Sequence, residues 1–275
     1  MISTFGKAKK NRGKPRNINI HHMPIPLIVQ DTIEHADIIL EVLDARFISK
    51  TRNQEIEKTI KKEGKLIIYV FNKSDLVDVN KIKRNIELEH LSPHLFFSSK
   101  VRKHSSNLRN LLKRESKKIN KESINIGVIG YPNTGKSSLI KSLAMKSKIR
   151  ISSESGYTKG AQKIKISDGL YLIDTPGIIP PEEKKSAMEE KLSQIGAIDW
   201  DKTKNPELAI HGLMRENPGV LEKNYKIEAE GDSEILIEEL GKKLRFFRKK
   251  NLVDEIRTAK KILRDWQEGK INPRI

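Results

Sequence analysis

Residues 130–137, GYPNTGKS, have the types and spacing of a loop that binds phosphate groups. They fit the pattern G-x-x-x-x-G-K-S, in which the glycines let backbone N–H groups approach phosphate oxygens. Lys136 can reach the β- and γ-phosphates of a nucleotide, and the Ser137 hydroxyl can bind Mg²⁺. The remaining candidate contacts of this segment are Asn133, Thr134, Gly135 and Ser138. Because so short a pattern also arises by chance, the flanking residues must support it.

The flanking residues predict the arrangement that phosphate binding requires. Residues 124–129 have the pattern of a buried strand, and Leu139, Ile140 and Leu143 have the spacing of one helix face. In a strand–loop–helix unit, the unpaired N–H donors and the positive dipole end of the helix face the loop. The pattern therefore favours a nucleotide site.

Two earlier apolar runs predict a parallel sheet. Residues 37–44 and 65–71 have the composition of buried strands, and residues 53–63 between them have a helical pattern that ends at Gly64. Buried strands that alternate with helices indicate an α/β fold, whose ligands bind beyond the carboxyl ends of the strands.

Polar residues follow two of the predicted strands at that edge. Asn72, Lys73 and Asp75 come after residues 65–71, and a carboxylate there can accept hydrogen bonds from guanine N1–H and N2–H₂, a donor pair that adenine lacks. An ordinary turn uses the same residue types, so both interpretations remain open. The candidate contacts after the strand at 95–97 are Ser98, Ser99 and Lys100, where a backbone N–H can bind guanine O6. A helix over 107–121 then leads to the phosphate loop.

A hairpin follows the phosphate loop. Asp168-Gly169 lies between apolar runs at 162–166 and 170–173, and DTPG follows. Asp174 can hold a water ligand of Mg²⁺, and the Gly177 N–H can bind a γ-phosphate. Thr158 is the favoured candidate for a second hydroxyl ligand, and the alternative is a plain surface threonine.

Composition indicates an anionic partner. The formal net charge is +18, and such an excess attracts nucleic acid. Residues 1–20 carry basic but no acidic side chains, which predicts a flexible arm; RNA contact and solubility are both open as its role. There is no cysteine, which excludes disulfides and thiolate metal sites. The lack of long apolar runs predicts a cytoplasmic protein without membrane contact.

Four apolar patterns of helical spacing follow Pro180. They comprise Ala187, Met188, Leu192 and Ile195; Leu208, Leu213 and Met214; Ile235, Leu236, Leu240, Leu244 and Phe247; and Val253, Ile256, Ala259, Ile262, Leu263 and Trp266. Basic residues occupy the opposite faces of the last two. Phe246 lies off the apolar stripe, where it can stack on a base or pack internally.

Together these motifs form the set of a guanine-nucleotide hydrolase in a permuted order, because NKSD and SSK precede the phosphate loop. The sequence resembles the circularly permuted GTPases and, among them, the ribosome biogenesis GTPase A family. The residues that carry this resemblance are Asp44-Ala45-Arg46, NKSD, GYPNTGKSSLI, DTPGI followed by Pro180, and residues 259–271.

The resemblance implies a P-loop GTPase domain with a mostly parallel sheet and a small C-terminal helical domain. The expected units are a basic arm at 1–20, the GTPase domain at 21–180 and an RNA-binding helical domain at 181–275. It also implies GTP/GDP and Mg²⁺ as ligands, and a switch in assembly of the large ribosomal subunit. Its partners would be rRNA and the precursor particle, without DNA; the oligomeric state is left open. Alternatives are a GTPase of another RNA-linked process and an RNA-binding protein with a structural nucleotide site.

Two catalytic expectations also rest on the resemblance. Ile178 follows DTPG and cannot orient water, whereas the family has an N-terminal His-Met motif that His22-Met23 matches. His22 would then position the attacking water, or it belongs only to the basic arm. Asn133 occupies the place of an asparagine that helps hold K⁺ in potassium-stimulated members, or it only shapes the loop.

Overall fold

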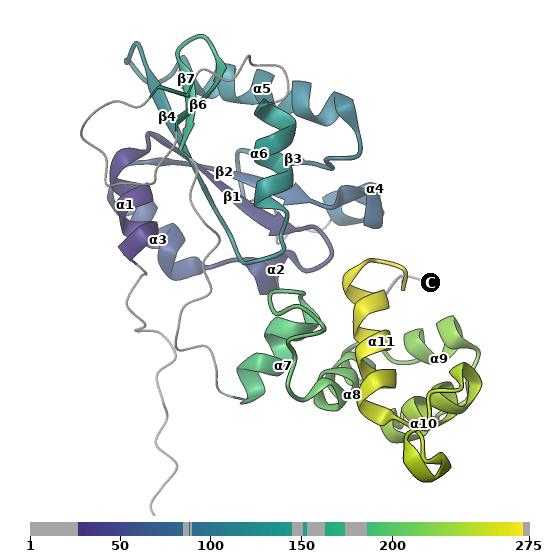
Figure 1. Cartoon of the computed structure of the whole chain (residues 1–275). Helices are drawn as coiled ribbons and strands as arrows, with labels where there is room; N and C mark the ends of the chain where they lie inside the picture. Colours follow the sequence, from purple (N-terminus) through teal and green to yellow (C-terminus); the bar gives the residue numbers. More distant parts are fainter. Residues whose placement is uncertain are drawn as a thin grey trace, which may run out of the picture.

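The computed structural model describes residues 27–84, 88, 90–144, 151–152, 163–173 and 186–271. Within these ranges, a sheet with helices on both faces makes up residues 27–173, called here the sheet unit. Residues 186–271 are helical and form the helical unit, which lies beside one edge of the sheet unit (Figure 1). No helix among the described residues combines the length and apolar character needed to cross a bilayer.

The sheet has the order β3-β2-β1-β4-β7-β6-β5. Its strands are β1 Ile38–Asp44, β2 Leu66–Asn72, β3 His94–Phe96, β4 Ile124–Ile129, β5 Ile151–Ser152, β6 Lys163–Ser167 and β7 Leu170–Ile173. The first five strands in that order pair in parallel, whereas β6 pairs antiparallel with both of its neighbours, β7 and β5. The mostly parallel α/β sheet predicted from the sequence is therefore confirmed, and so is the β6–β7 hairpin.

Both faces of the central strands are buried, which explains their continuous apolar sequences. Along β1, Leu40 and Val42 belong to a core covered by α5 Arg102–Ser116 and α6 Lys136–Ala144, whereas Ile39 and Leu43 belong to a second core. The second core is covered by α1 Leu27–His35 and α3 Gln54–Lys62. Since parallel strands end at one edge, Asp44, Asn72 and Gly130 meet there.

The predicted helix at 107–121 is misplaced. Helix α5 begins five residues earlier, at Arg102, and ends at Ser116. Residues 102–106 are polar and give no apolar signal, although most of them tolerate a helix. Ile119 still packs against the first core from beyond the helix end. Short elements without a strong pattern complete the unit: α2 Ile48–Thr51, the 3₁₀ turn Ser74–Leu76 and α4 Val79–Lys83.

The helical unit contains a helix that the sequence did not predict. Its helices are α7 Ser186–Gln194, α8 Pro206–Glu216, α9 Val220–Tyr225, α10 Ser233–Leu244 and α11 Glu255–Gln267, of which α9 is too short to show a period. Five residues of the predicted apolar stripes are exposed: Leu208, Ile235, Leu244, Phe247 and Ile256. The core of the helical unit uses Leu236 and Leu240 from the predicted stripe together with Ile237, which the stripe did not include, because packing selects only part of each stripe. Phe247 lies beyond α10, in a bridge to Val253.

Candidate functional site

The loop between β4 and α6 has the backbone that a phosphate cradle needs. Gly130 and Gly135 have φ of 144° and 96°, in the region that favours glycine. A Cβ on Gly130 would overlap the Val42 carbonyl oxygen, so the loop passes directly over the end of β1. The buried Thr134 closes the turn, as its Oγ1 donates to the Tyr131 carbonyl at 2.8 Å.

Lys136, the first residue of α6, is held inside this loop. Its Nζ donates to the carbonyl oxygens of Gly130 at 2.8 Å and Tyr131 at 2.6 Å. Burial lowers the pKa of Lys136 to about 8. Phosphate oxygens beside this ammonium group would offset that burial and favour its charged form.

The NKSD motif contacts the phosphate loop directly. Asn72, the last residue of β2, donates from Nδ2 to the Thr134 carbonyl at 2.6 Å. A Cβ on Gly135 would overlap that same Nδ2, so the approach requires glycine. Two motifs that are 62 residues apart in the chain thus form one surface.

Asp75 is presented as a carboxylate beside the end of β3. Its Oδ1 accepts from Ser98 Oγ at 2.8 Å, and its Oδ2 accepts from Lys100 Nζ at 2.7 Å. Burial opposes ionisation, but the bonds from Lys100 and Ser98 outweigh it and hold the pKa of Asp75 below its ordinary value. The ionised form is the one that can accept two donors from guanine.

Of the backbone N–H groups after β3, one is the candidate donor to guanine O6. Ser98 N donates to His104 Nδ1 at 2.9 Å, and Lys100 N donates to Ser98 Oγ at 3.3 Å. Among the hydrogen bonds of the described residues, the Ser99 N–H has no such acceptor, so Ser99 is the candidate. Burial lowers the pKa of His104, which favours the neutral ring that accepts from Ser98. Sequence patterns gave no signal for His104.

A cavity of about 210 Å³ joins these groups. From the sheet unit it is lined by Asn72, Lys73, Asp75, Leu76, Ser98, Ser99, Lys100, Gly135 and Ser138. Gln267 and Glu268, at the end of α11, complete the lining from the helical unit. We call this cavity the base pocket. The helical unit therefore closes it, which no local motif indicated.

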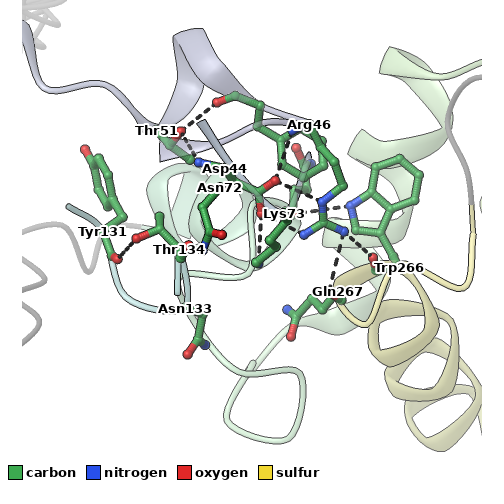
Figure 2. A network of polar contacts seen from close by, with 12 residues as sticks. Asp44, Arg46, Thr51, Asn72, Lys73, Tyr131, Asn133, Thr134, Trp266 and Gln267 are labelled. Atoms are coloured by element: carbon green, nitrogen blue, oxygen red, sulfur yellow. Dashed lines mark hydrogen bonds and ion pairs between the residues drawn. The ribbon is translucent and has the colours of Figure 1, made fainter. Parts of the chain in front are cut away.

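A buried ion-pair network connects the base pocket to α11 (Figure 2). Asp44 Oδ2 lies 2.8 Å from both Arg46 Nη2 and Lys73 Nζ, and Arg46 Nη1 donates to the Trp266 carbonyl at 2.9 Å. Burial raises the pKa of Asp44, but Arg46 and Lys73 more than offset this and keep it below its ordinary value. Arg46 belongs to the Asp-Ala-Arg tripeptide, for which the sequence suggested no contact.

At the phosphate loop a second contact reaches the helical unit. Asn133 Nδ2 donates to Asp199 Oδ1 at 2.6 Å, and both residues are accessible to solvent. Asn133 has φ of 58°, a left-handed conformation that asparagine tolerates, which is what a loop-shaping role needs. Nearby, Tyr131 packs on the small core of Leu192, Ile195 and Ala197.

Four predicted site residues lie outside the described residues: His22, Thr158, Asp174 and Gly177. Of the predicted Mg²⁺ ligands, only Ser137 is described. It lies exposed in the first turn of α6, and its hydroxyl oxygen is a ligand type that Mg²⁺ accepts.

Comparison with known proteins agrees with this geometry. Residues 125–237 match the family model described as 50S ribosome-binding GTPase. The chain is 36% identical to the uncharacterized GTP-binding protein MJ1464 of Methanocaldococcus jannaschii, over 91% of this chain and 66% of that protein. It is also 36% identical to nucleolar GTP-binding protein 2 of Saccharomyces cerevisiae, over 87% of this chain and 50% of that protein. The chain thus spans only part of the length of these relatives.

A solved structure has the same fold. A crystal structure of GNP-bound YlqF from T. maritima superposes with a TM-score of 0.63 at 21% identity, covering 88% of this chain and 92% of that one. The NKSD motif precedes the phosphate loop in sequence yet lies against it, so the fold has the arrangement of a circularly permuted GTP-binding protein. The chain belongs with the circularly permuted GTP-binding proteins, of which MJ1464 and nucleolar GTP-binding protein 2 are similar to it in sequence, and it shares its fold with YlqF.

Proposed function

We propose that this protein binds GTP and hydrolyses it to GDP and phosphate, as a switch in assembly of the large ribosomal subunit. The observation that carries the proposal is the base pocket, in which Asp75 and the phosphate loop meet and which Gln267 and Glu268 close from the helical unit. Family membership and the names of the relatives support the same function.

In the proposed complex, Asp75 accepts the two guanine donors and Ser99 N–H binds O6. Lys100 now pairs with Asp75 and is 74% exposed, so it can move aside without losing hydration. A carboxylate also has enough lone pairs to keep the Ser98 bond. Adenine would leave Asp75 without the donor pair that guanine supplies, which gives selectivity.

At the other end, the loop N–H groups and Lys136 bind the β- and γ-phosphates. Ser137, with the predicted ligands Thr158 and Asp174, would hold Mg²⁺, which neutralises charge that develops on the phosphates. The Gly177 N–H would bind the γ-phosphate. Two further roles in the attack on the γ-phosphate stay predictions: His22 would orient the attacking water, and Asn133 would help hold K⁺ near the phosphates.

The helical unit is the proposed output of the switch. It touches the phosphate loop through Asp199 and the base pocket through Gln267 and Glu268. A change in the loop on loss of the γ-phosphate can therefore reach the helical unit by direct contact, without passing through the rest of the sheet.

The proposed partner is an rRNA-containing precursor of the large subunit. A net charge of +18 favours such a polyanion, and the matching family model is described as 50S ribosome-binding. The domain limits at 20 and 180, the RNA role of residues 1–20 and a cytoplasmic location stay predictions.

Turnover measurements test the function. The full chain is expected to prefer GTP over ATP by at least tenfold in affinity, and its GTP hydrolysis should rise when purified large subunits are added. Small subunits serve as the matched control. Equal affinity for ATP and GTP would remove the base assignment. GTP hydrolysis that no ribosomal particle changes would favour a GTPase of another RNA-linked process, and GTP binding without hydrolysis, even with large subunits present, would favour a structural nucleotide site.

A further inference from the structure

A second cavity, of about 380 Å³, opens on the helical unit. It shares no lining residue with the base pocket. Trp200 precedes α8, Phe246 follows α10, and Arg257, Lys260 and Arg264 come from one face of α11. We call it the α11 cavity. Its volume lies within the range of about 300–1,000 Å³ typical of small-ligand sites.

Two arginine–aromatic pairs line the α11 cavity. The Arg257 guanidinium carbon lies 4.1 Å from the centre of the Phe246 ring, and that of Arg264 lies 5.2 Å from the Trp200 ring. A cation–π contact of this kind holds each guanidinium over the face of its ring. Flat aromatic and guanidinium planes are the surfaces on which unpaired bases stack.

The charge around the cavity is strongly positive. Residues 242–264 contain ten Lys or Arg and two acidic residues. Arg264 pairs with Glu268, but among the described residues neither Arg257 nor Lys260 has a carboxylate within ion-pair distance. Asp254, the acidic residue in the lining, caps α11 by accepting from Arg257 N at 3.1 Å. Unneutralised cations beside each other favour a polyanionic ligand.

We propose that the α11 cavity binds an unpaired base of single-stranded RNA, with the adjoining phosphates on Arg257 and Lys260. The choice of RNA rests on the proposed function; the stacking geometry does not depend on it. An acidic protein segment would satisfy the charge but would leave the aromatic and guanidinium planes unused. Lys260 Nζ already donates to the Asp201 carbonyl at 2.8 Å, which fixes it at the cavity edge.

Binding of labelled single-stranded RNA of about ten nucleotides to the full chain tests the proposal. The informative variants remove stacking but keep charge: Arg257→Lys and Phe246→Leu. Each is expected to weaken binding about tenfold, with an unchanged salt dependence. Lys61→Ala and Lys62→Ala, exposed on α3 in the sheet unit, are the control and should change affinity less than threefold. Thermal unfolding verifies that each variant is folded.

Two probes separate base recognition from charge alone. An abasic oligonucleotide of equal length keeps the phosphates and should bind about tenfold more weakly. The chain has two tryptophans, of which Trp266 is 1% exposed, so RNA should quench Trp200 fluorescence, and Trp200→Phe should abolish that quenching. Equal affinity for the abasic probe, or equal competition by polyglutamate, would overturn the proposal.

GTP affinity and turnover measured on the same preparations separate the two proposals. Base-dependent RNA binding without GTP binding would contradict only the proposed function. GTP turnover stimulated by large subunits, without base-dependent binding at the α11 cavity, would overturn only the inference made here.

Discussion

The helical unit contacts the two ends of the nucleotide site by different means. At the base end, the Arg46 guanidinium is 3% exposed, pairs with a fully buried Asp44 and donates to the Trp266 carbonyl. At the phosphate end, Tyr131 packs on the small apolar core of the helical unit, and the polar contact is a hydrogen bond between Asn133 and Asp199 that is accessible to water. Removing a partner from a buried ion pair costs about 3–5 kcal/mol, whereas an exposed hydrogen bond contributes about 1 kcal/mol or less.

This difference matches what hydrolysis changes. The guanine base is the same in GTP and GDP, so a firm contact at the base end can persist through the cycle. The γ-phosphate is present only in GTP, and a weak contact near it can form or break at little cost. The comparison therefore predicts that the helical unit pivots about the base end and responds at the phosphate end.

The largest effect is expected from Arg46→Ala. The change leaves Asp44 buried with Lys73 as its remaining cation, so we expect a loss of about 3–5 kcal/mol in unfolding free energy, together with weaker GTP binding. Urea unfolding measures the first and calorimetry the second. Lys103→Ala, exposed on α5, is the matched control. A loss below about 1 kcal/mol would show that the base end is not the firmer contact.

Lys136→Ala addresses the phosphate end itself. It removes charge-assisted bonds to the phosphates and is expected to weaken GTP binding by about 3 kcal/mol. The unfolding free energy of the nucleotide-free protein should change little. Lys141→Ala, exposed on the same helix, should bind normally. Wild-type affinity and turnover in Lys136→Ala would mean that residues 130–137 do not bind the phosphates.

Asp75→Asn is expected to change which base is preferred. It replaces one acceptor by a donor opposite guanine N2, so GTP should bind about 2 kcal/mol more weakly, whereas xanthosine triphosphate, with an oxygen there, should gain. The control is Asp78→Asn, which alters an exposed helix cap outside the base pocket. Unchanged preference between the two nucleotides would refute the role of Asp75.

Stability should also depend on pH, but not through the base end. Burial and then Glu57 raise the pKa of Glu41, in the middle of β1, to about 8 from its ordinary 4.5. The folded chain thus binds this proton more tightly than the unfolded chain, so its stabilisation is complete below pH 4.5 and is lost as pH rises through about 8. The pKa of Asp44 is below its ordinary value, so Asp44 stays ionised over this whole pH range and does not contribute to the change.

Urea unfolding at about pH 6 and pH 9 checks this assignment. The wild type should be less stable at the higher pH, and Glu41→Gln should reduce the difference. An identical pH dependence in Glu41→Gln would locate the titration elsewhere.

The sequence predicted those parts of the site that are local. The phosphate loop and NKSD depend on short motifs next to buried strands, and Asn72 and Thr134 indeed meet. The contacts of Arg46 with Trp266 and of Asn133 with Asp199 could not be predicted, because they join segments 220 and 66 residues apart through packing. A sequence pattern within one segment carries no information about which distant segment will pack against it.

The helical unit shows why some residues that were predicted to be buried are exposed. Apolar spacing located α10 and α11, but Ile235 and Ile256 of those stripes are exposed while Ile237 is buried. Periodicity gives the direction of a helix face within about one residue, and the final orientation depends on the neighbouring helices. The exposed Ile256 and the neighbouring Phe246 became lining of the α11 cavity.

The smallest effect, and the sharpest test of the phosphate end, concerns Asn133. If its amide helps hold K⁺, hydrolysis should be faster in KCl than in NaCl at equal ionic strength, and both Asn133→Gly and Asn133→Ala should lose that advantage. If Asn133 only shapes the loop, Asn133→Gly should keep full turnover, because glycine accepts φ of 58°, whereas alanine should cost about 1 kcal/mol. Asp199→Ala removes the contact with the helical unit but keeps the Asn133 amide. If that amide binds K⁺, the Asp199→Ala variant should therefore still hydrolyse GTP faster in KCl than in NaCl, by at least as much as the wild type. A wild type indifferent to the cation would exclude the K⁺ role and leave the loop-shaping role. Asn133 then contacts the helical unit only by its weak hydrogen bond to Asp199, beside the packing of Tyr131 on that unit.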